Sequence, residues 1–531
     1  MKPAITFLLA AALLGGAVAV KTDGDDATCT VTLRLVDADT GRTLPGLMQI
    51  ADADGKPVDT PELLARGQGL SNKLPIARWK VLPGETTIKL PRKKLTLTAF
   101  SGLETEQRTV TVDLTGADKQ TVAIRLKRFY SASAKGYRSA NTHLHLMKLT
   151  RKECDRYLRE IPKADGLDMV FVSYLERAVA DREYISNRYT SDDLAKLTKQ
   201  SGVRFGNGEE HRHNFAGFGQ GYGHVMLLNI RKLIQPVSIG PGIMKIGTDG
   251  LPLRRGIETA KKDGATVIWC HNNWGMESAP SFLAGKIDAQ NIFDGGTHGS
   301  FKDSFYRYLN AGVRVPFSTG TDWFQYDFSR VYCDLRSDLT VKSWLDALAA
   351  GRSYITNGPL LELSVDGKQL GETVALRKVG KVALKARAFG RVDFRRIEVI
   401  VNGQVRAKRA SRKVGAHFEA EFSETLQIDG PSWIALRTPP PPVKGDKELT
   451  EAVPRNELGR DLFSHTSPIY VTVAGKSRFD SAVARQLLAE MLANRRIIAE
   501  KGKFADAVER GRVLDVYSDA IAALRKRIKR K

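Results

Sequence analysis

The segment Asn141-Thr-His143-Leu-His145-Leu146 is the stretch around which the rest of the chain is organised. Side chains alternate between the two faces of a β-strand, so His143 and His145 share one face and Leu144 and Leu146 the other. Along a strand the two imidazoles lie about 7 Å apart, close enough to bind one metal ion together. The alternative is a half-buried strand that happens to contain two histidines.

The region from about residue 137 to 357 alternates strand-like runs with helical ones. The run Ile257–Lys262 is helical, stops at Gly264, and leads into the apolar strand Ala265–Cys270. Glycine after a last helical turn is the expected helix end. Repeated helix-to-strand alternation predicts an α/β domain with a parallel, barrel-like sheet.

Metal-ligand residue types follow the predicted strands of this region. Glu210 comes after the strand Val203–Phe205, His271 follows Cys270, and Asp322 follows the strand ending at Phe317. Chemistry in α/β barrels collects at the carboxyl ends of strands. Seven of the 9 histidines also fall here, which favours a metal site over a chance pair.

The flanking regions are predicted to be β-structure. Short alternating strands with turn signals predict a β-sandwich at residues 20–130 and another at 360–475. The first is similar in pattern to transthyretin-like and carboxypeptidase-regulatory-like sandwiches. Residues 476–531 are predicted to be a basic helical tail with one apolar stripe, which packs on the protein's own surface or binds a partner. We favour the former.

The N-terminus reads as a secretory signal over residues 1–19, with Lys2, a short apolar core and an Ala17-Val-Ala19 cleavage site. No apolar run is long enough to span a bilayer, so we expect an exported protein, periplasmic or extracellular, without a transmembrane segment. The four cysteines show no zinc-finger spacing, and their pairing stays open.

The net charge of +23 indicates affinity for polyanions. Basic residues are spread along the chain and do not alternate with aromatic ones as in a nucleic-acid groove. We therefore expect an anionic envelope or matrix surface as a possible partner, rather than a specific nucleic acid.

The order of motifs in the central region resembles the PHP (polymerase and histidinol phosphatase) superfamily of metal-dependent hydrolases, and within it the carbaryl-hydrolase (CehA/McbA) branch. The resemblance covers residues 137–359. It rests on the HxH strand and on four further segments: Gly208-Glu-Glu210, Gly223-His224, the apolar run before His271, and Gly320-Thr-Asp322. It implies a distorted (β/α)7-type PHP barrel, flanked by the two β-sandwich domains.

The resemblance also implies the ligands of two divalent cations, which could be zinc, manganese or iron. One cation would be held by His143, His145, Glu210 and Asp322, and Glu210 would bridge to a second held by His224 and His271. Glu209 is the alternative to Glu210. The implied catalytic residues are His143, Glu210 and Asp322.

Two departures from the family pattern affect a third metal. Ser173-Tyr174-Leu175 replaces the usual Thr-Asp-His segment, and Phe324 replaces a histidine. A further histidine expected shortly after the HxH pair is absent as well. These losses predict two metals, with apolar or aromatic packing at the third site.

Two bridged cations acidify a shared water toward hydroxide. We therefore expect a hydrolase that cleaves an ester, amide, carbamate or phosphoester bond of a small-molecule substrate. A phosphodiesterase is one alternative, and a catalytically reduced envelope- or glycan-binding protein is another. The expected substrate-binding residues are His213, Tyr174, Asn272 and Arg330, for each of which packing, a solvated loop position or a surface ion pair is the alternative.

Overall fold

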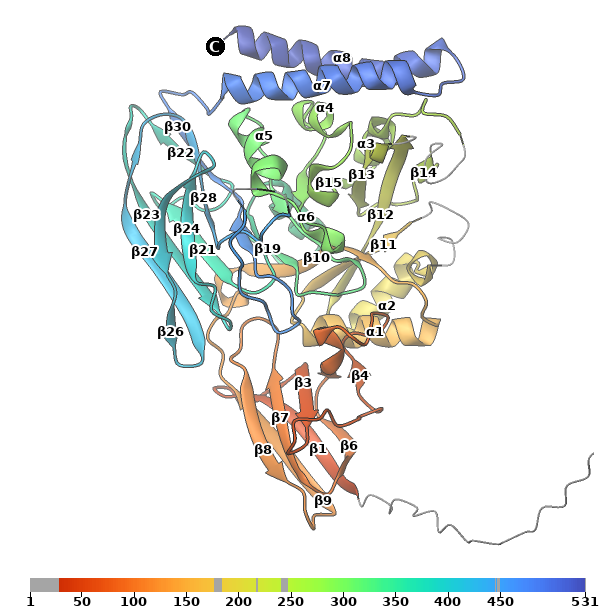
Figure 1. Cartoon of the computed structure of the whole chain (residues 1–531), viewed down its shortest axis with the longest axis vertical. Coiled ribbons are helices and arrows are strands. Elements are labelled where there is room, and N and C mark those ends of the chain that lie inside the picture. The colour runs from red at the N-terminus through yellow and green to blue at the C-terminus, as the bar shows by residue number, and fades with distance from the viewer. Residues whose placement is uncertain are drawn as a thin grey trace, which may run out of the picture.

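The computed structural model describes residues 28–175, 184–215, 218–239, 247–444, 446 and 449–530. An N-terminal β body lies at one end, a central α/β body carries a second β body on its flank, and a helical pair covers its far side (Figure 1). The predicted signal, residues 1–19, lies outside the described residues.

The N-terminal body consists of two facing sheets. One contains β1 (Thr28–Asp37), β2 (Thr43–Leu44), β6 (Thr86–Pro91) and β9 (Lys119–Leu126). The other contains β3 (Gly46–Ala51), β4 (Leu64–Ala65), β5 (Lys80–Leu82), β7 (Lys94–Phe100) and β8 (Arg108–Asp113). Alternate residues such as Val31 and Leu33 on one sheet and Leu95 and Leu97 on the other share one core, as the two-residue period of a strand requires.

The central body is built on a curled sheet. Its strands are β10 (Tyr137–His145), β11 (Met169–Tyr174), β12 (Arg204–Phe215), β13 (Phe218–Leu228), β14 (Ser238–Ile239), β15 (Thr266–Trp269), β16 (Ala289–Asn291), β17 (Phe317–Ser318), β18 (Asp322–Trp323), β19 (Arg330–Asp334) and β20 (Ser353–Thr356). The segment 317–323 pairs with β16 through β17 and with β10 through β18, which brings the two edges of the sheet together.

The central sheet is mixed. The β10–β11, β11–β12, β15–β16 and β16–β17 pairs are parallel, whereas β13 runs antiparallel to both β12 and β15. The reason is that β12 leads directly into β13 without a helix. The structure thus shows a curled α/β sheet, and the exact sevenfold barrel stays a prediction.

Helices cover this sheet: α1 (Arg151–Ala164), α2 (Ser191–Ser201), α3 (Leu253–Lys262), α4 (Ser278–Leu283), α5 (Arg307–Asn310) and α6 (Val341–Ala349). The first two begin at capping boxes built on Thr150 and Thr190, which satisfy free backbone N–H groups. The second ends at Gly202 in the left-handed conformation, as the glycine there predicts.

The C-terminal β body pairs directly with the central sheet. One layer holds β21 (Leu360–Val365), β23 (Gly380–Gly390), β26 (Arg412–Val414) and β27 (His417–Ile428). The other holds β22 (Thr373–Leu376), β24 (Arg396–Val401), β25 (Gln404–Ala410), β28 (Ser432–Arg437), β29 (Ser464–Thr466) and β30 (Ile469–Val473). It joins the central sheet where β29 pairs with β20.

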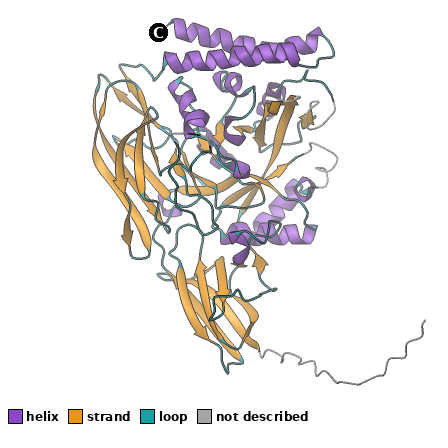
Figure 2. Ribbon diagram, viewed as in Figure 1, coloured by secondary structure: helices purple, strands orange, loops and turns teal. Residues whose placement is uncertain are grey.

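The chain finishes in two long helices, α7 (Ser481–Lys501) and α8 (Ala507–Lys529), which lie side by side over α4 and α5 (Figures 1 and 2). Their apolar residues, among them Met491, Val513 and Tyr517, belong to the same hydrophobic core as the central sheet. No helix of the described residues combines the length and apolar composition that crossing a membrane requires. All four cysteines are buried free thiols.

Candidate metal centre

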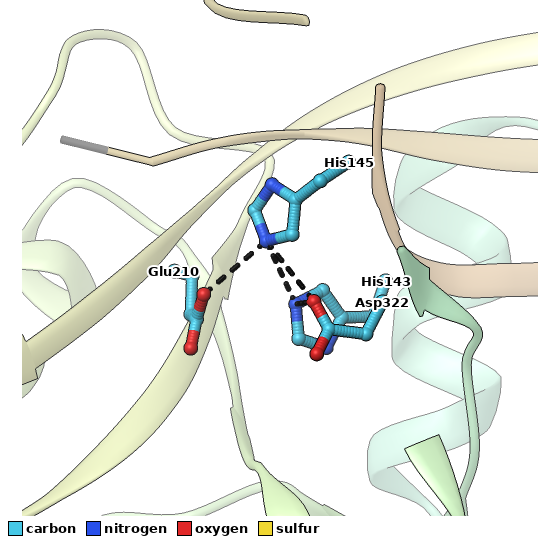
Figure 3. Close-up of side chains that lie close together, drawn as sticks. All are labelled: His143, His145, Glu210 and Asp322. Atoms are coloured by element: carbon cyan, nitrogen blue, oxygen red, sulfur yellow. Dashed lines mark hydrogen bonds and ion pairs between the residues drawn. The ribbon is translucent and has the colours of Figure 1, made fainter. Parts of the chain in front are cut away.

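The two histidines of β10 face each other at the end of the strand (Figure 3). Their side chains are fully buried, and their Nε2 atoms are 3.0 Å apart. His145 Nδ1 lies 3.0 Å from the carbonyl oxygen of Ser173, and His143 Nδ1 lies 3.1 Å from Asp294 Oδ2. Because these oxygens accept hydrogen bonds, a neutral imidazole here carries its proton on Nδ1 and presents a lone pair at Nε2.

Two carboxylates converge on the same point. Glu210 Oε2 is 3.2 Å from His145 Nε2, and Asp322 Oδ1 is 3.4 Å from His143 Nε2. The four ligand atoms all lie within 4.8 Å of one another, and all four residues are buried. Parallel pairing of β10 with β18 sets Asp322 beside Leu144 and so positions its carboxylate.

A second group shares Glu210 with the first. Glu210 Oε1 is 3.0 Å from His224 Nδ1 and 3.4 Å from His271 Nε2. His224 lies on β13 and His271 lies two residues after the end of β15, so the antiparallel pairing of β13 with β12 and β15 brings them together. One oxygen of Glu210 therefore faces each group, which is the geometry of a bridging carboxylate.

Asp294, which follows β16, links the two groups from behind. Its Oδ2 faces His143 Nδ1, and its Oδ1 accepts from the backbone N–H of His271 and lies 3.2 Å from His271 Nδ1. It is fully buried. A carboxylate bound to the far nitrogen of a metal-ligating histidine fixes the tautomer and ring orientation. Asp294 does this for one histidine of each group.

The backbone around the groups adopts left-handed conformations that L-residues rarely take. Asp322 has φ +59°, Phe324 has φ +55°, and His271, Asn272 and Asn273 have φ values of +53°, +54° and +71°. Such residues cost free energy and persist where surrounding structure holds them, often at functional sites.

The ionisation of the groups reflects burial and mutual contact. Burial raises the pKa of the Glu210 carboxyl, but the Arg212 guanidinium and three histidines outweigh it and hold that pKa well below its usual range. Burial lowers the pKa of His224 to about 4 despite the nearby Glu210. Burial also raises the pKa of Asp322. The ionised Glu210 and neutral His224 are the forms that bind a cation.

A third grouping of metal-ligand types consists of His143, Cys270 and Asp294. Burial, together with the nearby carboxylates, raises the pKa of the Cys270 thiol well above its usual value. A protonated thiol is a poor ligand. The two oxygens of Asp294 moreover already contact His143 and His271. In this third group Asp294 therefore orients His143.

The structure brings together all six residues expected to bind metal: His143, His145, Glu210, His224, His271 and Asp322. It places Glu210 rather than Glu209 there because neighbouring residues of β12 point to opposite faces. The metals themselves and the roles of the six residues stay predictions.

The expected substrate-binding residues make other contacts. His213 lies on the opposite face of β12, with Nδ1 2.6 Å from the carbonyl oxygen of Leu251. Arg330 is fully buried and donates to the carbonyl oxygens of Phe328 and Asp165. Both side chains are held in the interior by these contacts, and the substrate-binding roles expected for His213 and Arg330 stay predictions.

Tyr174 and Asn272 lie closer, but their polar atoms have partners. The Tyr174 hydroxyl donates to the carbonyl oxygen of Tyr189 over 2.6 Å. The Asn272 amide donates to Thr297 Oγ1, and its oxygen accepts from the N–H of Phe293. Both side chains thus connect their own segments to neighbouring ones by hydrogen bonds, and their substrate-binding roles stay predictions.

Two residues of the centre were missed by the sequence reasoning. Asp294 follows a strand of only three residues, Ala289–Asn291, which is too short to show a two-residue period in the sequence. Arg212 stands two residues after Glu210 and therefore on its face, by the rule already applied to His143 and His145.

The positions expected to have lost a third metal are occupied by packed side chains. Phe324 is buried, with its ring 6.0 Å from that of Tyr157 and against Gly69. Among the described residues, three groups of side chains could bind a metal, and none of them contains Tyr174, Leu175 or Phe324. The absence of a third metal stays a prediction.

Comparison with known proteins gives weak similarities. No family model matches the chain, and no curated protein matches it. A crystal structure of a two-domain protein from Bacteroides vulgatus ATCC 8482, containing a predicted PHP-like metal-dependent phosphoesterase, is 13% identical with a TM-score of 0.34, covering 57% of this chain and 92% of that one. The β-glucuronidase of Parabacteroides merdae is 11% identical with a TM-score of 0.17, covering 81% and 60%.

Proposed function

We propose that this chain is a metal-dependent hydrolase whose centre holds two divalent cations bridged by Glu210. The observation that carries the proposal is the convergence of buried ring nitrogens and carboxylate oxygens in two groups that share Glu210. Neither ring nitrogen of His224 nor Asp322 Oδ1 has a hydrogen-bond partner, and the Nε2 lone pairs of His143 and His145 point at each other. Such atoms repel unless a cation lies between them.

The donor set fits zinc, manganese or iron(II), which accept mixed imidazole and carboxylate ligands. When bound, two such cations polarise the scissile group and acidify a water. The chain itself orients the ligands: Asp294 and the Ser173 carbonyl hold the Nδ1 protons. The ring of Trp323 packs beside that of His145, with ring centroids 5.1 Å apart.

We further propose that the chain belongs to the CehA/McbA branch of the PHP superfamily and is exported. The motif order and the two-metal ligand set support the former, and the signal-like N-terminus the latter. The scissile bond is an ester, amide, carbamate or phosphoester.

The test is metal analysis of the purified protein, combined with hydrolysis assays. Wild type loaded with zinc, manganese or iron(II) should retain about two ions per chain. His143→Ala should lose both metal and hydrolysis of an aryl phosphodiester, ester or carbamate. His417→Ala, in the C-terminal β body, is the matched control and should retain both. A folded wild type that takes up no metal would exclude the hydrolase and favour the binding protein.

A further inference from the structure

Arg212 is a buried cation within the candidate metal centre. It lies on β12 directly opposite His224 in the β12–β13 pairing, so both side chains lie on the face that carries Glu210. Arg212 is 3% exposed. Its Nη1 is 3.7 Å from Glu210 Oε1, and its Nε and Nη2 have no hydrogen-bond partner.

Arg66 is a buried arginine with a structural role, and its hydrogen bonds provide a comparison for Arg212. Arg66 is fully buried, and its guanidinium donates to both oxygens of Asp165 and to the carbonyl oxygens of Gln325 and Asp327. Arg212 makes no comparable set of bonds. A buried guanidinium nitrogen without an acceptor is costly to hold, because it has lost its water without gaining a hydrogen bond.

Glu210 cannot serve as the full partner of Arg212. Its two oxygens already face three histidines at 3.0 to 3.4 Å. The proposed cations cannot pair with Arg212 either, because they carry the same sign of charge. The guanidinium fork of Arg212 matches an anion with two suitably spaced oxygens, such as phosphate or carboxylate.

We propose that Arg212 binds an oxyanion of the substrate beside His224 and His271. This inference rests on the proposed hydrolase function and deepens it: the substrate carries an anionic group at or next to the scissile bond. Arg212 thereby selects charged esters or phosphoesters over neutral amides and carbamates. The shared chemistry is that of an oxyanion, either phosphate-type or carboxylate.

The test measures anion binding by calorimetry on metal-loaded protein, with inorganic phosphate and with acetate as separate probes. Wild type should bind at least one of them, and the better ligand identifies the type of oxyanion. Arg212→Gln should weaken that binding about 10- to 100-fold, as expected for charge-assisted hydrogen bonds. Arg212→Lys keeps the charge without the fork and should fall between the two.

Arg255→Gln is the matched control, because Arg255 lies against the other face of β12 beside His211 and His213. It should leave anion affinity unchanged. Metal content and thermal melting are measured on every variant. A wild type without metal would overturn the proposed function and this inference together.

Three outcomes with metal-loaded wild type would overturn this inference alone. The first is that neither anion binds. The second is that folded Arg212→Gln keeps its metals and binds the anion as wild type does. The third is that Arg212→Gln and Arg212→Lys both lose metal, which would make Arg212 a partner of Glu210 only.

Discussion

The two faces of β12 carry similar residues and behave differently. On one face, Glu209 bonds His211 Nδ1 over 2.6 Å and the backbone N–H of Ile234 over 2.7 Å. His213 Nδ1 contacts the Leu251 carbonyl oxygen. This face packs on α3, where a Cβ at Gly256 would overlap the His211 ring. It is a closed network, whose members bond one another.

The other face carries Glu210 and Arg212, with His224 opposite. Here two guanidinium nitrogens and both His224 nitrogens lack hydrogen-bond partners. Both faces are buried, and both contain acids and bases. Burial and residue type therefore do not distinguish a structural network from a binding site. The difference lies in whether the polar atoms satisfy one another or require a ligand.

The largest effect on metal content and hydrolysis should come from replacing the acid on the open face of β12, Glu210, with glutamine. Glu210→Gln should reduce metal content in both groups and lower hydrolysis about a thousandfold or more, since bound metals supply several kcal/mol of transition-state stabilisation. Metal analysis and kinetics measure this. Glu209→Gln is the matched control: it should keep the metals but lower the free energy of unfolding by about 1–3 kcal/mol. The reverse pattern would refute the distinction between the faces.

Glu277 extends the comparison to another closed carboxylate, which accepts from the N–H groups of Leu253 and Arg254 at the start of α3. Burial raises its pKa from 4.5 to about 7. The folded state thus binds more protons than the unfolded state between these values, and stability falls as pH rises through this window, by about 3 kcal/mol in total.

Urea denaturation at pH 4.5 and at pH 7.5 measures this effect. Glu277→Gln should become more stable relative to wild type as pH rises, because it cannot ionise. Glu85→Gln, at an exposed position, should follow wild type at both pH values. An unchanged difference between Glu277→Gln and wild type would show that folding does not raise the pKa of Glu277.

Asp294→Asn should weaken both metal groups together, because Asp294 contacts His143 in one and His271 in the other. The expected loss is about 10- to 100-fold in affinity. Chelator competition measures it, with Asp288→Asn as control, since that carboxylate pairs with Lys261 outside the centre. A loss confined to one group would show that Asp294 orients a single histidine.

The smallest effect should come from Tyr174→Phe. Its hydroxyl is engaged by the Tyr189 carbonyl, so removal should cost about 1 kcal/mol of stability. Thermal melting gives that change. KM and kcat should match wild type; a raised KM would restore Tyr174 as a substrate-binding residue.

The sequence predicted the six grouped residues because they stand in motifs of fixed order, although Glu210 and His224 lie inside β12 and β13 and not after a strand. Strand alternation also separated Glu210 from Glu209 in principle. It could not place Arg330, whose burial depends on the carbonyl of Asp165, far away in sequence. The sequence also did not predict that β13 runs antiparallel to β12. The two strands are joined by a short connection without a helix, and their buried residues carry no pattern that marks a hairpin. Asp294 was missed because its strand is too short for periodicity.

The helices α7 and α8 have a consequence for how the protein is made. They supply core residues to the central body, yet they follow the whole C-terminal β body in the chain. During synthesis, the ribosome has released the strands that bear the candidate ligands long before Met491 and Tyr517 emerge. The core of the central body is therefore complete only after these helices emerge, and premature termination before α7 should yield a chain recognised by proteases rather than a smaller working protein.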